Sequence, residues 1–84
     1  MPDITFDVKK HLGVIADTGN GWKKEANIIS WNGRAAKLDI REWNSDKTKM
    51  KKGVTFSKTE IGELKKLILE IDVDEPDIFD AAVS

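Results

Sequence analysis

Apolar and polar residues alternate along much of the first 56 residues, which is the period-2 pattern typical of β-strands. The alternation changes phase near Lys10, which indicates a bulge or a bend within the first strand. Turn-forming residues separate the apolar segments, above all Thr18-Gly19-Asn20-Gly21 and Asn32-Gly33, because Gly and Asn tolerate positive φ. The pattern predicts four strands, over residues 4–17, 22–31, 36–43 and 50–56.

Beyond residue 56 the apolar residues recur every three or four positions, as they do on one face of an α-helix. Ser57-Lys58-Thr59-Glu60 has the spacing of a capping box, and the helix is expected to end near Ile71 or Asp72. The sequence therefore predicts an α+β fold, in which a four-stranded antiparallel β-meander precedes one C-terminal helix that covers one sheet face. The apolar stripe of this helix comprises Ile61, Leu64, Leu67, Ile68 and Ile71.

The chain has 84 residues and no cysteine, so it forms one small domain with a limited core and no disulfide. Oligomerisation is a reasonable source of additional buried surface for a domain of this size. The sequence has no apolar run long enough to span a membrane and no signal-peptide pattern. We therefore expect a soluble, cytoplasmic protein that can associate with the nucleoid.

The net charge of −1 hides an asymmetry along the chain. Residues 72–84 contain five acidic residues and no basic residue, so the rest of the chain has 14 basic residues against 10 acidic ones. Residues 22–52 alone contain nine basic and four acidic residues. This distribution predicts a nucleic-acid-binding domain over residues 1–72 and an acidic, flexible tail over residues 73–84.

The third predicted strand carries the main candidate surface. Leu38 and Ile40 point to one face, whereas Asp39, Arg41 and Trp43 point to the other face, which we expect to be exposed to solvent. Cations that can meet phosphates, beside a flat ring that can stack on a base, suit single-stranded nucleic acid. The candidate nucleic-acid-binding residues are Trp22, Lys23, Lys24, Lys37, Arg41, Trp43, Lys49, Lys51 and Lys52.

The three tryptophans and one glycine leave alternatives open. Trp31 shares a strand face with Ile29 and is expected in the core. Trp22 is either a stacking platform or a cap on the edge of the core, and Trp43 either stacks on a base or tucks under the following loop. Gly53 either permits a close approach of the backbone or is an ordinary loop residue.

Enzymatic chemistry has little support in this sequence. It contains no cysteine nucleophile, no Gly-rich phosphate loop and no cluster of carboxylates beside a base. Asp39 and Glu42 fall on opposite faces of one strand, so they cannot act as a pair. His11 is the only histidine and has no neighbouring ligand, which argues against a metal site. We therefore expect neither an enzyme nor a cofactor or metal.

Four short motifs follow one another in a characteristic order: Gly21-Trp22-Lys23-Lys24-Glu25, Ser30-Trp31-Asn32, the Leu-Asp-Ile-Arg-Glu-Trp run of residues 38–43, and the Met-Lys-Lys-Gly-Val-Thr-Phe-Ser run of residues 50–57. Over about residues 4–71 the chain resembles the single-strand-binding C-terminal domain of the eukaryotic transcriptional positive cofactor four, and more closely its bacterial relatives of the YdbC type. The resemblance implies a homodimer whose helices pack together and whose curved sheets form grooves for single-stranded DNA, without base-specific readout.

The expected function is therefore sequence-independent binding of single-stranded DNA by a homodimer, in transcription, replication or repair. The expected dimer interface comprises Ile61, Leu64, Ile68 and Ile71. Two alternatives stay open at this point: a binder of single-stranded RNA that uses the same groove, and a protein-interaction module that acts through the sheet edge or the acidic tail. In either case the tail can also recruit a protein partner or compete with DNA for the basic groove.

Overall fold

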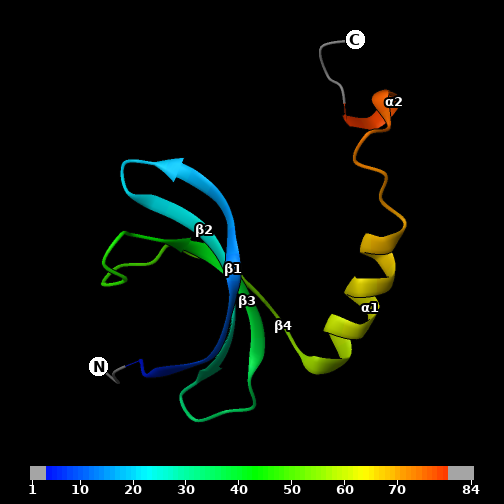
Figure 1. The fold of residues 1–84 in the computed structure, drawn as a ribbon. Helices are drawn as coiled ribbons and strands as arrows, with labels where there is room; N and C mark the ends of the chain where they lie inside the picture. Colours follow the sequence, from blue (N-terminus) through cyan, green and yellow to red (C-terminus); the bar gives the residue numbers. More distant parts are fainter. Residues whose placement is uncertain (1–3, 80–84) are drawn as a thin grey trace.

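The computed structural model describes residues 4–79 (Figure 1). Four antiparallel strands form one sheet in the order β1-β2-β3-β4, and the helices follow them along the chain. The predicted order of four strands and one C-terminal helix is confirmed, and a short second helix follows within the predicted tail. The elements are β1 (Phe6–Gly19), β2 (Trp22–Trp31), β3 (Lys37–Trp43), β4 (Val54–Phe56), α1 (Lys58–Leu69) and α2 (Pro76–Phe79).

The fourth strand is shorter than the sequence pattern predicts. Met50 forms only an isolated bridge with Trp43, and regular pairing resumes where Val54 meets Ile40. In β3, two residues lie between these pairs, Arg41 and Glu42, whereas three residues, Lys51-Lys52-Gly53, lie between them in the opposite segment. The ladder is therefore interrupted at Lys51-Lys52-Gly53. Periodicity along one strand cannot reveal this mismatch, because the mismatch depends on the partner strand.

The sheet is strongly curved because β1 contains several irregularities. β1 has 14 residues and β2 has 10, and their register shifts between Val8 and Lys10 and at three further points along the ladder. Each extra residue bends the strand and increases its twist. Both ends of the sheet consequently bend away from α1, which lies on the convex side (Figure 1). The predicted irregularity near Lys10 is confirmed, and three more were missed.

A two-residue turn joins β1 to β2. Asn20 and Gly21 both have positive φ, of 56° and 81°, as a type I′ hairpin turn requires. The predicted Asn32-Gly33 turn also has positive φ at both positions, at 51° and 73°. Here, however, three further residues separate the turn from β3. This longer connection lies beside the candidate site described below.

The small core lies on the concave face of the sheet. Ile29 and Trp43 are only 0% and 3% exposed, and the Phe6 ring lies 5.5 Å from Trp43 and 5.3 Å from Trp31 between centroids. Asp39 shares this face and is 0% exposed. The prediction that Asp39 and Trp43 lie on a solvent-exposed face is therefore wrong. The curvature closes this face over them, and Phe6 covers it from β1.

The helix begins as predicted. The Ser57 hydroxyl accepts from the Glu60 N–H, and the Glu60 carboxylate accepts from the Ser57 N–H at 2.8 Å, which completes the capping box. The hydrogen bond that the Ser57 N–H donates to the carboxylate lowers the pKa of Glu60. The helix ends at Leu69, slightly earlier than predicted, and none of its residues is fully buried. In the tail, α2 is described, whereas residues 80–84 lie outside the described residues.

Candidate nucleic-acid interface

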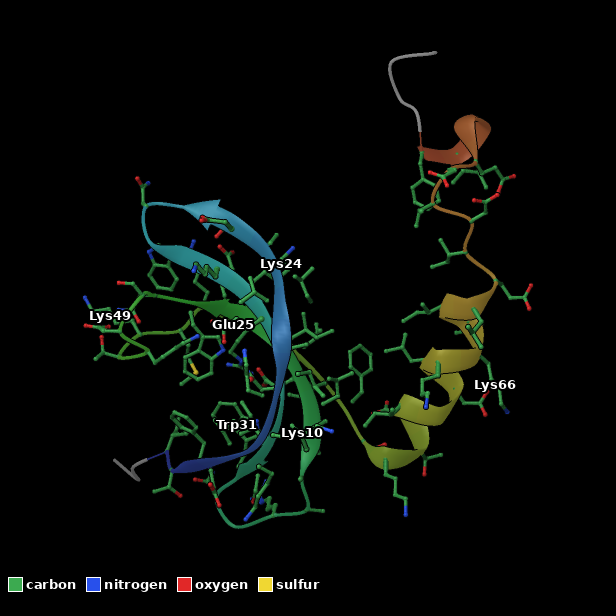
Figure 2. All side chains as sticks on the ribbon, in the orientation of Figure 1. Lys10, Lys24, Glu25, Trp31, Lys49 and Lys66 are labelled. Carbon is green, nitrogen blue, oxygen red and sulfur yellow. The ribbon has the colours of Figure 1, made fainter. Side chains whose placement is uncertain are left out.

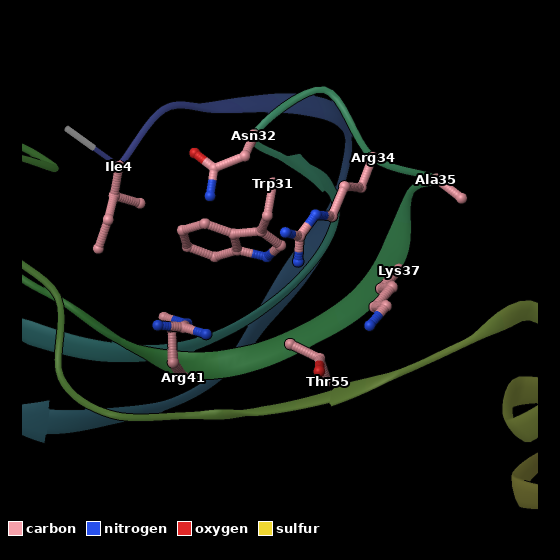
Figure 3. A pocket seen from close by; sticks show the side chains of 8 residues that line it. All are labelled: Ile4, Trp31, Asn32, Arg34, Ala35, Lys37, Arg41 and Thr55. Atoms are coloured by element: carbon pink, nitrogen blue, oxygen red, sulfur yellow. The ribbon is translucent and has the colours of Figure 1, made fainter. Parts of the chain in front are cut away.

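A hollow of about 380 Å³ opens inside the curve of the sheet, at the end where β2 leads into β3 (Figure 3). Trp31 forms one wall, and the guanidinium of Arg41 lies over its ring, with Cζ 4.7 Å from the ring centroid. The remaining walls come from the N-terminal segment, the β2–β3 connection, β3 and β4. The lining residues are Ile4, Trp31, Asn32, Arg34, Ala35, Lys37, Arg41 and Thr55.

Arg41 is held in place by a buried partner. Its Nε and Nη2 atoms donate to the two carboxylate oxygens of Asp39, at 2.7 and 2.6 Å. This two-point contact fixes the plane of the guanidinium, because both partners are planar and the geometry matches. The Arg41 side chain is 14% exposed and the Asp39 side chain 0%. Arg41 thus forms a fixed platform above Trp31 rather than a freely moving cation.

The electrostatic character of the hollow is positive. Arg34, Lys37 and Arg41 line it, and none of its lining residues is acidic. Asp39 offsets the charge of Arg41, so Arg34 and Lys37 provide the net charge at this site. Such cations can neutralise phosphates, and the part of the Trp31 ring that Arg41 does not cover can stack on a base without selecting its identity.

The structure divides the predicted binding residues between two faces of the sheet. Strand alternation and pairing place Lys23, Lys37, Arg41 and Trp43 on the concave face. The same alternation places Lys24 and Glu42 on the opposite face, where Lys24 lines another opening with Lys52 and Gly53, which Arg41 also reaches. Lys49 is exposed in the β3–β4 loop. The predicted set therefore does not form one continuous groove in a single chain.

Trp22 is half-buried and already has a cationic neighbour. The Lys51 ammonium lies 4.8 Å from the centroid of the Trp22 ring and 3.6 Å from Oε1 of Glu42. The pKa of Glu42 is lowered, first because the Thr18 hydroxyl donates to its carboxylate and then because of the charge of Lys51. A base can use the ring face beneath Lys51 only if Lys51 moves.

The structure departs from the expectation that Trp31 lies in the core, and of the two alternatives for Trp43 it does not favour stacking on a base. Trp31 does share its face with buried Ile29, but it lies at the rim, is half-buried and lines the hollow. Trp43 is buried beneath Phe6, which leaves little of its ring for stacking in this chain. Arg34 was also missed. The signal available in the sequence was the position of Trp31 at the end of a strand, followed closely by Arg34 and Lys37.

Gly53 is required by close packing of the backbone. A Cβ atom at this position would overlap the Cβ of Arg41 and lie 2.6 Å from the Ile40 carbonyl oxygen. We expect Gly53→Ala to destabilise the protein by about 1–3 kcal/mol, because β4 must move away from β3 to accommodate the methyl group. Urea denaturation of the two proteins measures this difference.

Gly62→Ala is the matched control for this substitution. Gly62 lies in α1, where an added Cβ meets nothing within 4 Å. Alanine at an open helical position is expected to stabilise the protein by about 0.5–1 kcal/mol. A Gly53→Ala protein as stable as the parent would show that β4 is not held against Arg41 as described.

The described residues give no sign of a metal centre or of a membrane span. No three His, Asp or Glu side chains within residues 4–79 are grouped so that they can hold a metal ion. No helix in this part of the chain has the length and apolar character that crossing a bilayer needs.

One comparison with known proteins identifies a family, and a second finds a bacterial relative. The family model described as Transcriptional Coactivator p15 (PC4) matches residues 19–67, which is more than half of the chain and includes β2, β3, β4 and most of α1. An uncharacterised protein of Treponema pallidum (strain Nichols) is 44% identical over 72 residues, which cover 86% of this chain and 85% of that protein.

Proposed function

The chain belongs to the Transcriptional Coactivator p15 (PC4) family, and from this premise we propose that it binds single-stranded DNA as a homodimer with little dependence on sequence. The family binds nucleic acid and is not enzymatic. The observation that carries the proposal is the hollow in which Trp31 lies between the cations Arg34, Lys37 and Arg41. The process served is transcription, replication or repair.

The shape of the hollow favours a single strand over a duplex. Trp31 lies inside the curve of the sheet, so a base must leave its neighbours and turn toward the protein to reach the ring (Figure 3). Bases in a single strand are free to do so, whereas bases in a duplex are paired and stacked. Arg34 and Lys37 can then neutralise the phosphates on either side of the stacked base.

The unfilled surface of α1 supports the proposal of a homodimer. Ile68 and Ile71 are 52% and 50% exposed, and Ile61 and Leu64 are half-buried. The radius of gyration is 15.5 Å, whereas a compact chain of this length has about 12 Å. The apolar face of α1, which its own sheet leaves largely uncovered, is stabilised by burial against a second surface. The α1 of an identical chain can provide that surface.

We expect Trp31→Ala to weaken binding to oligo-dT by about 5- to 150-fold, because one base loses its stacking partner, which contributes roughly 1–3 kcal/mol. The salt dependence of binding should stay the same, since the substitution removes no charge. Fluorescence anisotropy of labelled oligo-dT, titrated at several salt concentrations, measures both quantities. A duplex of the same length serves as the competitor that should bind weakly.

Lys37→Ala provides the matched comparison. It removes a cation from the same hollow and leaves Trp31 in place, so the slope of log affinity against log salt should decrease by about one. If Trp31→Ala binds oligo-dT as tightly as the parent protein, the hollow is not the binding site. If the parent binds neither single strand nor duplex at low salt, the proposed function fails.

RNA of the same sequence belongs in this assay, because stacking and phosphate contacts do not distinguish the two sugars. If RNA binds more tightly than DNA, RNA replaces DNA as the proposed ligand.

The acidic tail supports a second proposal, since Ile78 and Phe79 are 66% and 52% exposed beside acidic residues. We propose that this segment offers a docking surface for a protein partner, which a chain ending at residue 72 would lose while it retains DNA binding.

A further inference from the structure

A second hollow, of about 260 Å³, lies on the concave face on the other side of Phe6. The Phe6 ring contacts Trp31, which lines the first hollow, and Trp43, which lines the second. The two hollows are therefore close enough to receive neighbouring parts of one strand. Unlike the first hollow, the second contains a carboxylate, because Glu25 of β2 lines it (Figure 2).

Glu25 is almost fully buried, at 3% exposure. Lys47 donates to its Oε2 atom, whereas Nδ1 of His11 lies 3.7 Å from Oε1, which is too long for a hydrogen bond. Among residues 4–79 no donor is bonded to Oε1. The carboxylate therefore has an acceptor to spare inside the hollow.

The groups beside Glu25 add both hydrogen-bond donors and a hydrogen-bond acceptor to this hollow. His11 Nδ1 lies 2.6 Å from the Asn27 Oδ1 atom, so in the neutral ring Nδ1 is the donor and Nε2 is left as an acceptor. The indole Nε1 of Trp43 is buried without a hydrogen-bond partner among the described residues. Lys47 brings a cation whose pKa is lowered, first by partial removal from water and then by the charge of Lys23.

We infer that this hollow is a base-reading subsite that accepts guanine, an inference that rests on the proposed binding of single strands. A phosphate is excluded, because it would lie against the buried carboxylate of Glu25. The Phe6 ring, which is 39% exposed, gives the hollow an apolar wall that suits an aromatic ring. The occupant is therefore a base, and Glu25 requires that its edge present N–H donors.

Guanine meets this requirement better than the other bases. Its Watson–Crick edge presents two adjacent donors, N1–H and N2–H₂, to the carboxylate, and its O6 atom can accept from a donor such as Lys47. Cytosine and adenine present one amino group each, and thymine presents a single N3–H. The structure thus predicts one guanine-preferring position within a groove that is otherwise indifferent to sequence.

The test compares two oligonucleotides, oligo-dT and the same strand with one central guanine, by competition anisotropy on the full-length protein. A single guanine cannot form secondary structure in this context. We expect the guanine strand to bind about five- to tenfold more tightly. Replacing that guanine with hypoxanthine removes only the N2 amino group, and we expect it to reduce the gain at least twofold without any change to the protein.

Glu25→Gln should abolish the gain, and Glu42→Gln is its matched control. Glu42 also pairs with a lysine, Lys51, but lies on the opposite face of the sheet. Both variants lose one negative charge, so both should bind oligo-dT, which contains no guanine, more tightly by a similar factor. Only Glu25→Gln should lose the difference between the two strands.

Four results would overturn the inference. Equal affinity of the parent for both strands, or equal affinity for the guanine and hypoxanthine strands, would remove guanine reading and leave the proposed function standing. A guanine preference that persists in a folded Glu25→Gln protein would place the reading elsewhere. Absence of binding to either strand would remove the proposed function together with this inference.

Discussion

Asp39→Ala is expected to destabilise the protein by about 3–5 kcal/mol, because it leaves the partly buried Arg41 guanidinium without its carboxylate. Asp39 is 0% exposed and occupies two donors of Arg41, at 2.7 and 2.6 Å. A domain of this size has a total stability of the same order, so the variant should be largely unfolded at room temperature. Circular dichroism with urea denaturation measures the loss.

A double variant separates loss of the ion pair from loss of packing. Asp39→Ala combined with Arg41→Met removes both charges, so it should recover part of the stability that Asp39→Ala alone loses. Asp7→Ala is the surface control, since Asp7 pairs with Lys9 at 2.7 Å while its side chain is 66% exposed. That substitution should change stability by less than about 1 kcal/mol. An Asp39→Ala protein with unchanged stability would contradict the buried ion pair.

The ion pair also sets the form of the binding site. With Asp39 in place, Arg41 is held over Trp31 and lines the hollow. Any Asp39 variant that still folds should therefore bind DNA with altered affinity, since Arg41 becomes a mobile cation with its full charge. Asp39 acts here as a positioning residue, because it lies beneath the hollow and does not line it.

The strands, the turns and the helix cap could be predicted because each depends on neighbours in the sequence. Ser57 and Glu60 cap the helix within one turn, and Asn20-Gly21 closes a hairpin on its own. The faces of β3 were also separated correctly, with Arg41 opposite to Leu38 and Ile40. These features need no knowledge of how distant strands meet.

The prediction was wrong where curvature decides the outcome. Alternation shows that Asp39 and Trp43 share a face, but it does not show whether that face is open or folded over. Four register shifts in β1 bend the sheet and bring Phe6 onto Trp43. The same bend exposes Trp31 at the rim. The partial exposure of Trp31 and the burial of Trp43 thus follow from a property of the β1–β2 pairing, which the pattern of β3 alone does not contain.

Leu64→Asp is expected to abolish the dimer and unfold the protein in one transition. Leu64 is half-buried at the centre of the α1 stripe, between Ile61 and Ile68. The proposed interface would bury it against both the sheet and the partner helix, where an unpaired carboxylate is strongly unfavourable. Since α1 buries no residue fully within its own chain, a separated protomer has too little core to remain folded.

Sedimentation equilibrium and circular dichroism test this prediction together, with Lys65→Asp as the matched control. Lys65 adjoins Leu64 on the exposed face of α1, so the same substitution there should leave the dimer and the fold intact. The melting temperature of the parent should rise with protein concentration, as mass action requires when folding and association are coupled. A soluble, folded Leu64→Asp monomer would show that the apolar stripe of α1 does not carry the stability of the protein.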